Sequence, residues 1–360
     1  MNNDYNKFRI EYLKSSLSIS TFVGCNMGCK YCILSSLKFG VLPEKIADEA
    51  DLVNDLCTHK FFIKGFTPIS INNRTDPFLN PIVKESTFTV LKLLQEKKVT
   101  KNPLMLITKK ELSGTELEWL DESGLNIYLF LSYSGLPKTV EPNNETFNET
   151  HLINLRKTKN IHKIHYWRPI IEGVNNDDQD INKMLATASS TFDCSIVSGI
   201  RLSKEVITLL KKNTKISFEY QKERAIHKYL SDSTIEKILT LRNRIYSKYL
   251  LFRHTSCVIS HMENKPDYNL SYLKPKSCIF GCPNSNNCMS TLGQCNKQII
   301  EKSLSNLGIS GVKYHCDGNT QLNINADLTQ EEISYLKHNS RMVIVSRSVI
   351  NSPSESKIVK

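Results

Sequence analysis

Cys25-Asn26-Met27-Gly28-Cys29-Lys30-Tyr31-Cys32 is the stretch that decides how this chain is organised, because it sets three cysteines at the spacing C-x3-C-x2-C. The apolar run 17–23 precedes it and predicts a strand that enters a loop. Thiolates bind soft metal centres, and an iron–sulfur cluster usually takes four of them. Three ligands so close together leave one iron without a local protein ligand. The spacing therefore predicts a reactive cluster with an open iron.

A zinc knuckle and a set of ordinary buried cysteines are the alternatives for this motif. Structural zinc prefers a closed tetrahedral set of ligands, often made by two C-x2-C pairs. No such set is completed around residues 25–32. The iron–sulfur cluster is therefore the preferred interpretation.

Length and composition indicate a globular protein with one large domain or two moderate ones. The chain has 360 residues, and 40% of them are hydrophobic, which is enough for a sizeable core. Residues 1–7 contain no apolar signal-peptide core, and no apolar run approaches membrane-spanning length. We therefore expect a soluble cytoplasmic protein without membrane contact. Because the cytosol keeps thiols reduced, the 11 cysteines point to metal binding rather than disulfides.

The chain is strongly basic, with 47 basic against 36 acidic residues and a net charge of +11. Such a balance favours polyanionic partners, or simply gives a soluble basic surface. Residues 237–262 contain no acidic side chain, and basic residues there are interleaved with aromatic ones. The members are Arg242, Arg244, Tyr246, Lys248, Tyr249, Phe252 and Arg253. This pattern suits contacts with bases and phosphates, and equally a long helix whose aromatic residues lie in the core.

Strands and helices alternate through the first 212 residues. The predicted strands are 17–23, 67–72, 104–108, 127–132, 164–171 and 195–202. The predicted helices are 43–56, 85–98, 113–124, 149–158, 180–189 and 204–212. This alternation implies right-handed crossovers and a parallel sheet, with ligands at the carboxyl ends of the strands.

The pattern changes after residue 203. A capping-box pattern at residues 233–236 predicts a long helix to about residue 252. Further on, 321–326, 329–338 and 342–345 predict a strand, a helix and a strand, with another capping box at Thr329 and Glu332. We predict a barrel over 1–215, a helical connection over 216–255, and a smaller α+β cysteine-rich domain over 256–360 that carries an auxiliary metal cluster.

The cysteine motif resembles that of the radical S-adenosylmethionine (radical SAM) enzymes in its spacing, in the aromatic Tyr31 and in its place after a first strand. The resemblance implies an α/β fold, a partial (β/α)6 barrel, and a four-iron four-sulfur cluster held by Cys25, Cys29 and Cys32. In that family the open iron chelates the amino and carboxylate groups of S-adenosylmethionine (SAM). Reductive cleavage of SAM gives a 5′-deoxyadenosyl radical, which abstracts hydrogen from a substrate. The resemblance also implies a reducing partner such as flavodoxin or ferredoxin.

Three later stretches resemble the spore photoproduct lyase and DNA-repair-photolyase-like branch of that family. They are 73–77 (Asn-Arg-Thr-Asp-Pro), 129–134 followed by Glu141-Pro142, and 168–175, and the resemblance covers about residues 15 to 205. In that branch polar groups at the strand ends grip SAM. Carried over, the candidates are Tyr31, Asn73, Asp76, Ser132, Ser134 and Arg168. A guanidinium can bind the SAM carboxylate, and Asp, Asn or Ser can meet the ribose hydroxyls.

One departure from this branch concerns the fourth strand. Spore photoproduct lyase proper uses a cysteine there as hydrogen donor, whereas residues 130–134 of this chain contain none. Repair of thymine dimers by that mechanism is therefore not expected.

A second group of cysteines, Cys278, Cys282, Cys288 and Cys295, has the spacing C-x3-C-x5-C-x6-C. Gly, Pro, Asn and Ser separate its members, so the segment can fold as a loop around a metal. We predict an auxiliary four-iron four-sulfur cluster, with a structural zinc site as the alternative. Cys257 and Cys316 flank the group and could replace a member.

Three functions are compatible with these patterns. The preferred one is a radical SAM enzyme acting on a nucleic acid or nucleotide-like substrate, because of the net charge and the basic stretch. The alternatives are a radical SAM enzyme that modifies a peptide or protein, and a non-catalytic iron–sulfur or zinc-binding module. A non-catalytic module does not need a cluster with an open iron, so the three-cysteine site favours the two enzyme functions.

Overall fold

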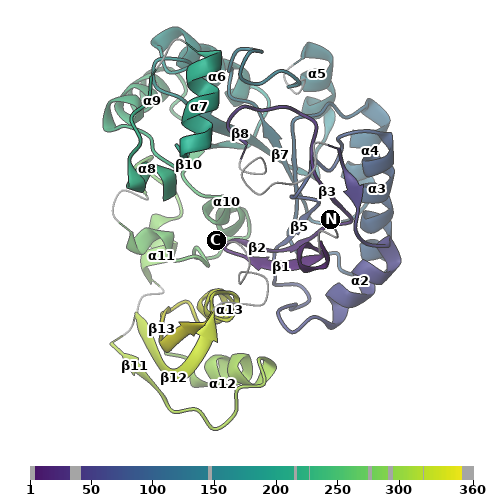
Figure 1. The fold of residues 1–360 in the computed structure, drawn as a ribbon, viewed down its shortest axis with the longest axis vertical. Helices are drawn as coiled ribbons and strands as arrows, with labels where there is room; N and C mark the ends of the chain where they lie inside the picture. The colour runs from purple at the N-terminus through teal and green to yellow at the C-terminus, as the bar shows by residue number, and fades with distance from the viewer. Residues whose placement is uncertain are drawn as a thin grey trace.

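The computed structural model describes residues 5–32, 42–144, 148–214, 217–226, 228–274, 278–290, 295–318 and 320–350. Its main feature is a sheet with the strand order β1-β2-β5-β6-β7-β8-β9-β10. β1 (Ile10–Leu13) runs antiparallel to β2 (Ser16–Ile19), and each following neighbour is added in parallel. The further strands are β5 (Ile69–Ile71), β6 (Leu104–Thr108), β7 (Ile127–Ser132), β8 (His162–Ile170), β9 (Cys194–Gly199) and β10 (Leu250–Phe252). β1 and β10 are not paired with each other, so the sheet is an open, curved partial barrel (Figure 1).

This α/β architecture confirms the fold class predicted from the sequence. The six predicted strands correspond to β2 and to β5 through β9. The sheet gains β1 at one edge, and at the other β10, which comes from the segment 216–255 predicted as a helical connection. The predicted long helix is shorter than expected, because α9 (Asp232–Ile245) ends before β10 begins. Its cap is Ser231, which accepts the N–H of Thr234, and not Ser233.

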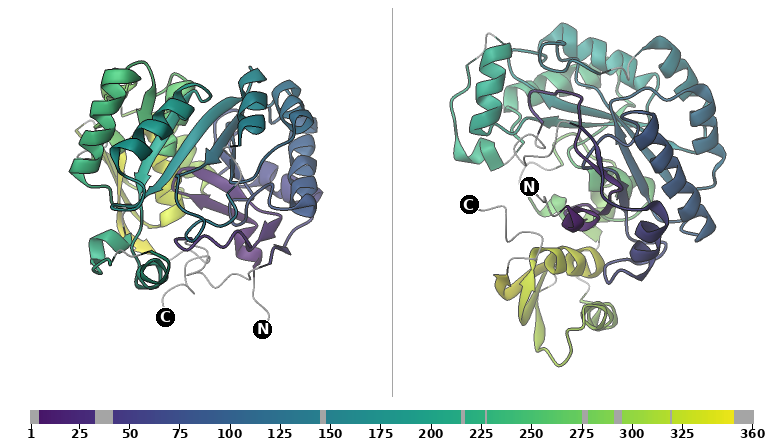
Figure 2. Two further views of the ribbon diagram at one scale, coloured as in Figure 1. Left: turned by 90° about the horizontal axis from the view of Figure 1, so that it is seen from above. Right: turned by 45° about the vertical axis from the view of Figure 1, so that its right-hand side comes forward.

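Helices cover the outer face of the curved sheet (Figures 1 and 2). They include α2 (Glu49–Thr58), α3 (Pro81–Glu96), α4 (Gly114–Glu122), α5 (Glu149–Lys157) and α6 (Asp178–Ser189), and α7 (Lys204–Asn213) and α8 (Lys222–Ile226) follow β9. The capping box predicted at Ser113 and Glu116 opens α4. The predicted helix 43–56 begins only at Glu49, because Asp48 caps α2 and Glu44–Lys45 pair as β4 with β3 (Phe22–Val23). Within the described ranges, no helix is both long and apolar enough to cross a bilayer.

Side chains alternate between the two faces of the sheet, as the two-residue period of a strand requires. In β7, Leu129 packs with the outer helices, whereas Tyr128 and Phe130 belong to a separate core on the inner face. That inner core includes α10 (Thr255–Met262), which lies inside the curve of the sheet (Figure 1). Glu263 follows α10 and accepts a hydrogen bond from the Tyr128 hydroxyl (2.9 Å), so the helix is fastened to the barrel wall.

The aromatic residues of the basic stretch lie largely in the core. Tyr249 is buried, and its hydroxyl is hydrogen-bonded to Ser195 (2.8 Å). Phe252 is buried in the inner core. Their burial fits the interpretation as core residues, and neither ring is available for stacking on a base.

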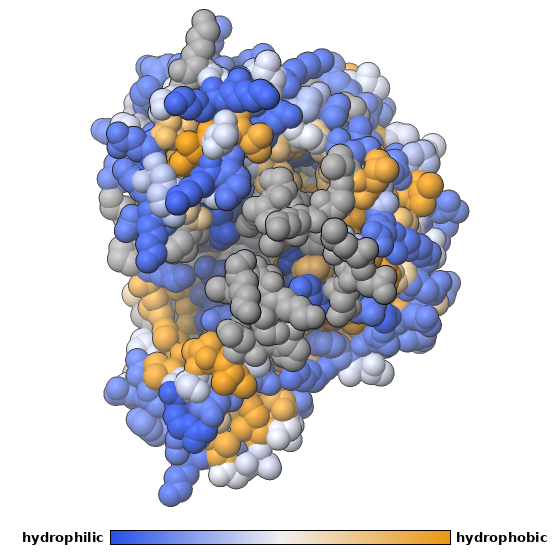
Figure 3. All heavy atoms as spheres, viewed as in Figure 1, coloured by the Kyte–Doolittle hydropathy of each residue, from blue (hydrophilic) through white to orange (hydrophobic). Residues whose placement is uncertain are grey.

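The C-terminal part forms a small α+β unit next to β1 (Figure 1). Its sheet has the order β11-β12-β13, and its elements are α11 (Ser285–Ser290), α12 (Lys297–Asn306), β11 (Tyr314–Asp317), β12 (Gln321–Thr329), α13 (Gln330–Ser340) and β13 (Val343–Ile350). The capping box predicted at Thr329 and Glu332 opens α13. α13 packs on β1, where the Tyr12 hydroxyl meets Nδ1 of His338 at 2.7 Å. Figure 3 shows hydrophobic surface on this part of the molecule.

Candidate active site at the carboxyl ends of the strands

A cavity of about 620 Å³ lies where the carboxyl ends of β6 to β9 meet the first cysteine loop, residues 25–32. The strand ends contribute Thr108, Lys109, Ser132, Arg168, Pro169, Gly199, Ile200 and Arg201. All three cysteines of the predicted cluster line the same cavity. Ligands of parallel α/β barrels bind at this end of the strands. This cavity is therefore the candidate active site.

The first cysteine loop is held in place by the segment that follows β7. Gly28 has φ +73°, and a Cβ there would stand 3.3 Å from Cγ of Pro142. The backbone N–H of Lys30 donates to Val140 O (3.0 Å), and Asn143 Nδ2 donates to Met27 O (3.2 Å). Glycine is needed at position 28 because the left-handed backbone and the close approach of Pro142 both disfavour a side chain.

None of the three thiols is in a disulfide, and all are partly buried. Burial raises the pKa of Cys25 to about 12 and that of Cys29 to about 11, so metal binding would have to displace protons from them. Among the described residues, no three Cys, His, Asp or Glu side chains stand close enough together to hold one metal ion. The donor set nevertheless has the right chemistry for a cluster with an open iron, because three thiols of one loop, none of them in a disulfide, line one cavity.

Glu141 is the centre of a buried hydrogen-bond network beside these thiols. Its carboxylate accepts hydrogen bonds from the Tyr31 hydroxyl, from Lys109 Nζ and from Ser134 Oγ (3.2 Å). Asn144 Nδ2 donates to the same carboxylate (3.0 Å). Burial and the Glu141 charge raise the pKa of Tyr31 well above its ordinary value. This single carboxylate thus ties the cysteine loop to the ends of β6 and β7.

Sequence reasoning assigned no role to Glu141 or Lys109. The available signals were weak: Lys109 directly follows a predicted buried strand, and Glu141 precedes a proline in one of the stretches that carry the family resemblance. Their pairing joins residues far apart in the chain, so local sequence could not reveal it.

The structure brings four of the six predicted SAM-binding residues to the cavity: Tyr31, Asp76, Ser132 and Arg168 line it. Ser134 is buried and donates to Glu141 instead. Asn73 does not line the cavity. In the turn after β5, the buried asparagine is its neighbour Asn72.

Asp76 is already engaged within the protein. Its carboxylate accepts from Thr108 Oγ1 (2.7 Å), from the Lys109 N–H (2.7 Å) and from the Phe78 N–H (3.0 Å). Burial raises its pKa, and the hydrogen bond from the Lys109 N–H is the largest effect that opposes the rise. Its present contacts join the turn after β5 to the end of β6.

Arg168 lies near the end of β8, and its guanidinium stacks on Tyr166 at 3.5 Å from the ring centroid. Stacking takes up the face of the guanidinium and leaves its in-plane N–H groups for a ligand. In the described part of the chain, Arg168, Arg201 and Lys228 form no ion pair with a carboxylate. Lys228 remains open to water in the cavity, yet the protein around it and the charges of Arg168 and Arg201 lower its pKa well below the ordinary value.

Gly199 explains how Lys228 reaches this cavity. A Cβ at this position would stand 1.3 Å from the carbonyl oxygen of Tyr229, which no structure allows. The bare backbone at the end of β9 lets residues 228–230 pass directly over it, and Ile200 and Tyr229 form an antiparallel bridge there. Glycine is therefore required at position 199, because only a residue without a side chain lets residues 228–230 form this part of the cavity wall.

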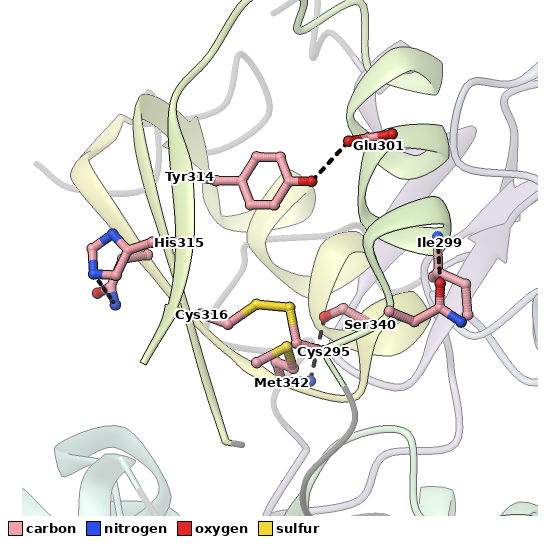
Figure 4. The surroundings of a disulfide bond; sticks show 10 residues. Cys295, Ile299, Glu301, Tyr314, His315, Cys316, Ser340 and Met342 are labelled. Carbon is pink, nitrogen blue, oxygen red and sulfur yellow. Dashed lines mark hydrogen bonds between the residues drawn. A yellow bond between two sulfur atoms is a disulfide. The ribbon is translucent and has the colours of Figure 1, made fainter. Parts of the chain in front are cut away.

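One predicted metal ligand is wrong in this structure. Cys295 forms a disulfide with Cys316 of β11, with a Cα–Cα distance of 6.4 Å (Figure 4). It precedes α12, and its sulfur is bonded to a residue of the small sheet. The expectation that the cysteines serve metal binding and not disulfides is also wrong for this pair.

Comparisons with known proteins find similarity at the level of structure. No protein-family model and no curated protein matches the chain. Spore photoproduct lyase in complex with dinucleoside spore photoproduct superposes with a TM-score of 0.51 at 12% identity, covering 68% of this chain and 78% of that chain. A mutant of that enzyme with bound AdoMet and dinucleoside spore photoproduct gives the same TM-score, identity and coverage. A radical SAM methyltransferase from Sphaerobacter thermophilus gives a TM-score of 0.39 at 13% identity, covering 56% of this chain and 64% of that chain. The chain therefore has the radical SAM fold in the form found in spore photoproduct lyase.

Proposed function

We propose that this chain is a radical SAM enzyme whose first cysteine loop holds a four-iron four-sulfur cluster and SAM. The observation that carries the proposal is the set of three thiols, Cys25, Cys29 and Cys32, on the wall of a cavity at the carboxyl ends of parallel strands. When bound, the cluster and SAM would supply the reductive chemistry that starts hydrogen abstraction from the substrate. The fold shared with spore photoproduct lyase supports this class of chemistry.

In this proposal Arg168 binds the SAM carboxylate. Its stacking on Tyr166 fixes the plane of the guanidinium before any ligand arrives, so little conformational freedom is lost on binding. Ser132 lines the cavity, and Lys109 Nζ donates to its hydroxyl (3.0 Å), which orients that hydroxyl for the ribose. Tyr31 positions the cysteine loop through Glu141 and does not need to touch SAM.

The proposed substrate is a nucleic acid or a nucleotide-like molecule, recognised in part through phosphate. The cations that line the cavity are Lys30, Lys109, Arg168, Arg201 and Lys228, and Asp76 is the carboxylate that lines it. Glu141 neutralises Lys109, and the SAM carboxylate accounts for Arg168. Lys30, Arg201 and Lys228 then line the cavity without a carboxylate partner among the described residues. Positive charges close to one another repel. A phosphate bound between them would relieve this repulsion and accept hydrogen bonds from them, so its binding would be favourable.

We also propose a second metal centre beyond the barrel, with Cys278, Cys282 and Cys288 among its ligands. These three cysteines are not in disulfides, whereas Cys295 is bonded to Cys316. A reducing partner such as flavodoxin or ferredoxin would supply electrons to the enzyme.

Release of 5′-deoxyadenosine tests the proposed activity. Anaerobically reconstituted protein given dithionite and SAM should release it, and Cys29→Ala should release none. Cys57→Ala is the matched control, because Cys57 is a free, half-buried thiol on α2 that does not line the cavity. Normal release by Cys29→Ala would contradict the proposal.

Salt-dependent binding of a short oligonucleotide tests the substrate class. Lys228→Ala should weaken binding and reduce the slope of log affinity against log salt concentration by about one, because one phosphate contact is lost. The control is Lys302→Ala, which removes an exposed lysine of α12 outside the cavity. Equal slopes for Lys228→Ala and the wild type would argue against a phosphate at this position.

A further inference from the structure

The cysteines beyond the barrel repeat the local design of the first cysteine loop. Residues 25–29 and 278–282 share the pattern C-x2-G-C. The glycine before the second cysteine, Gly28 or Gly281, has φ +73° in one loop and +65° in the other. The hydrogen bonds to sulfur differ between the loops: the backbone N–H of Met27 donates to the first cysteine of its motif, Cys25, and that of Asn284 donates to the second of its own, Cys282. The two loops thus share a left-handed glycine between two cysteines.

Cys288 completes the thiols of the second cysteine loop, residues 278–288. It is buried within α11 and accepts a hydrogen bond from the backbone N–H of Asp267 at 3.3 Å. Asn284 Nδ2 lies 3.7 Å from the same sulfur and also donates to it. Hydrogen bonds from amide groups stabilise a thiolate, and they are among the groups that tune sulfur-bound metal centres.

Cys257 is the free cysteine that meets this loop from the barrel side. It lies in the first turn of α10, inside the curve of the sheet. Its thiol is within electrostatic range of Cys282, Cys278 and Cys288. Cys257 and Cys282 also border the same inner core. The fold therefore brings Cys257, which lies 21 residues before Cys278 in the chain, near the second loop as a fourth thiol.

We propose that Cys257, Cys278, Cys282 and Cys288 bind an auxiliary four-iron four-sulfur cluster in which every iron has a protein ligand. The proposal rests on the second metal centre of the proposed function and supplies its complete ligand set. Among the described residues, no three of these thiols lie close enough together to bind one metal ion. Assembly of the cluster must therefore bring the second loop closer to α10. The cluster would then fasten the C-terminal part to the inside of the barrel, and its closed coordination leaves no iron for SAM.

Metal analysis of a variant that lacks the first cluster tests this assignment. Protein carrying Cys25→Ala, Cys29→Ala and Cys32→Ala should retain about four irons per chain after anaerobic reconstitution. Adding Cys257→Ser to that background should remove nearly all of this iron. Adding Cys57→Ser or Cys295→Ser should leave it in place, since neither residue belongs to the proposed set.

Iron lost with Cys295→Ser and kept with Cys257→Ser would overturn the ligand set, and zinc in place of iron would overturn the cluster. If Cys257→Ser fails to fold, Mössbauer spectra of the background variant with and without SAM still decide. Unchanged spectra support full protein ligation, and a change on adding SAM reveals an open iron and refutes the proposal. The background variant lacks the first cluster, so these results do not depend on whether the chain cleaves SAM.

Discussion

Replacing Glu141 tests whether one buried carboxylate holds the active site together. The Glu141 side chain is 1% exposed and its partner Lys109 is 15% exposed. Removing one partner of a buried ion pair costs about 3–5 kcal/mol, because the other charge is left without compensation. The hydroxyls of Tyr31 and Ser134 lose their acceptor as well, although water entering the cavity can replace part of it. We therefore expect Glu141→Ala to lower the free energy of unfolding by about 3–5 kcal/mol.

Urea unfolding of the metal-free protein measures this change. Glu141→Gln keeps the shape and one acceptor oxygen but loses the charge, so it should cost about 1.5–3 kcal/mol. The matched control is Glu149→Gln, whose side chain is 72% exposed and pairs with Arg156 at 3.3 Å. A pair of that kind contributes at most about 1 kcal/mol. If Glu141→Ala unfolds within about 1 kcal/mol of the wild type, the reasoning is refuted.

Two further predictions concern single residues of the barrel. Arg168→Lys should weaken SAM binding to the reconstituted enzyme about tenfold in calorimetry, because the planar guanidinium and its stacking on Tyr166 are lost. Arg201→Lys serves as the control. Equal SAM affinities of Arg168→Lys and the wild type would show that Arg168 has a structural role. Burial lowers the pKa of His165 to about 4, below the ~6.5 of an unfolded chain. The unfolded state therefore binds more protons between these values, so stability should fall as the pH drops from about 6.5 to 4, by about 3 kcal/mol from this group. His165→Asn should flatten the slope of unfolding free energy against pH in that window, and an unchanged slope would count against it.

The parallel strands could be predicted from the sequence because they are buried on both faces and read as continuous apolar runs. β10 could not be predicted, since Leu250, Leu251 and Phe252 are few and continue the apolar pattern of α9. Only the pairing of these residues with Cys194 to Ile196 makes them a strand. Tertiary contacts, and not the local sequence, therefore determine that residues 250–252 form a strand.

The active site shows the same division between local and tertiary information. The cysteine spacing predicted that three thiols act together, and the three line one cavity because the loop that carries them is short and follows β3. The Glu141 network joins residues 31, 109 and 134, and Lys228 depends on the bare backbone at Gly199. Contacts between such distant positions leave no spacing pattern in a single sequence.

The two C-x2-G-C loops differ in where their remaining thiols come from, and this difference separates their chemistry. After Cys29, the third thiol follows within the same loop at Cys32, and all three line a cavity large enough for a cofactor. A cluster there would keep an open iron. After Cys282, the chain enters α11, and a fourth thiol, Cys257, approaches from the inside of the barrel. A cluster there would be closed and limited to electron transfer or to holding the fold together. Because the two loops share the C-x2-G-C motif and its left-handed glycine, the surrounding fold and not the motif would decide which centre can react.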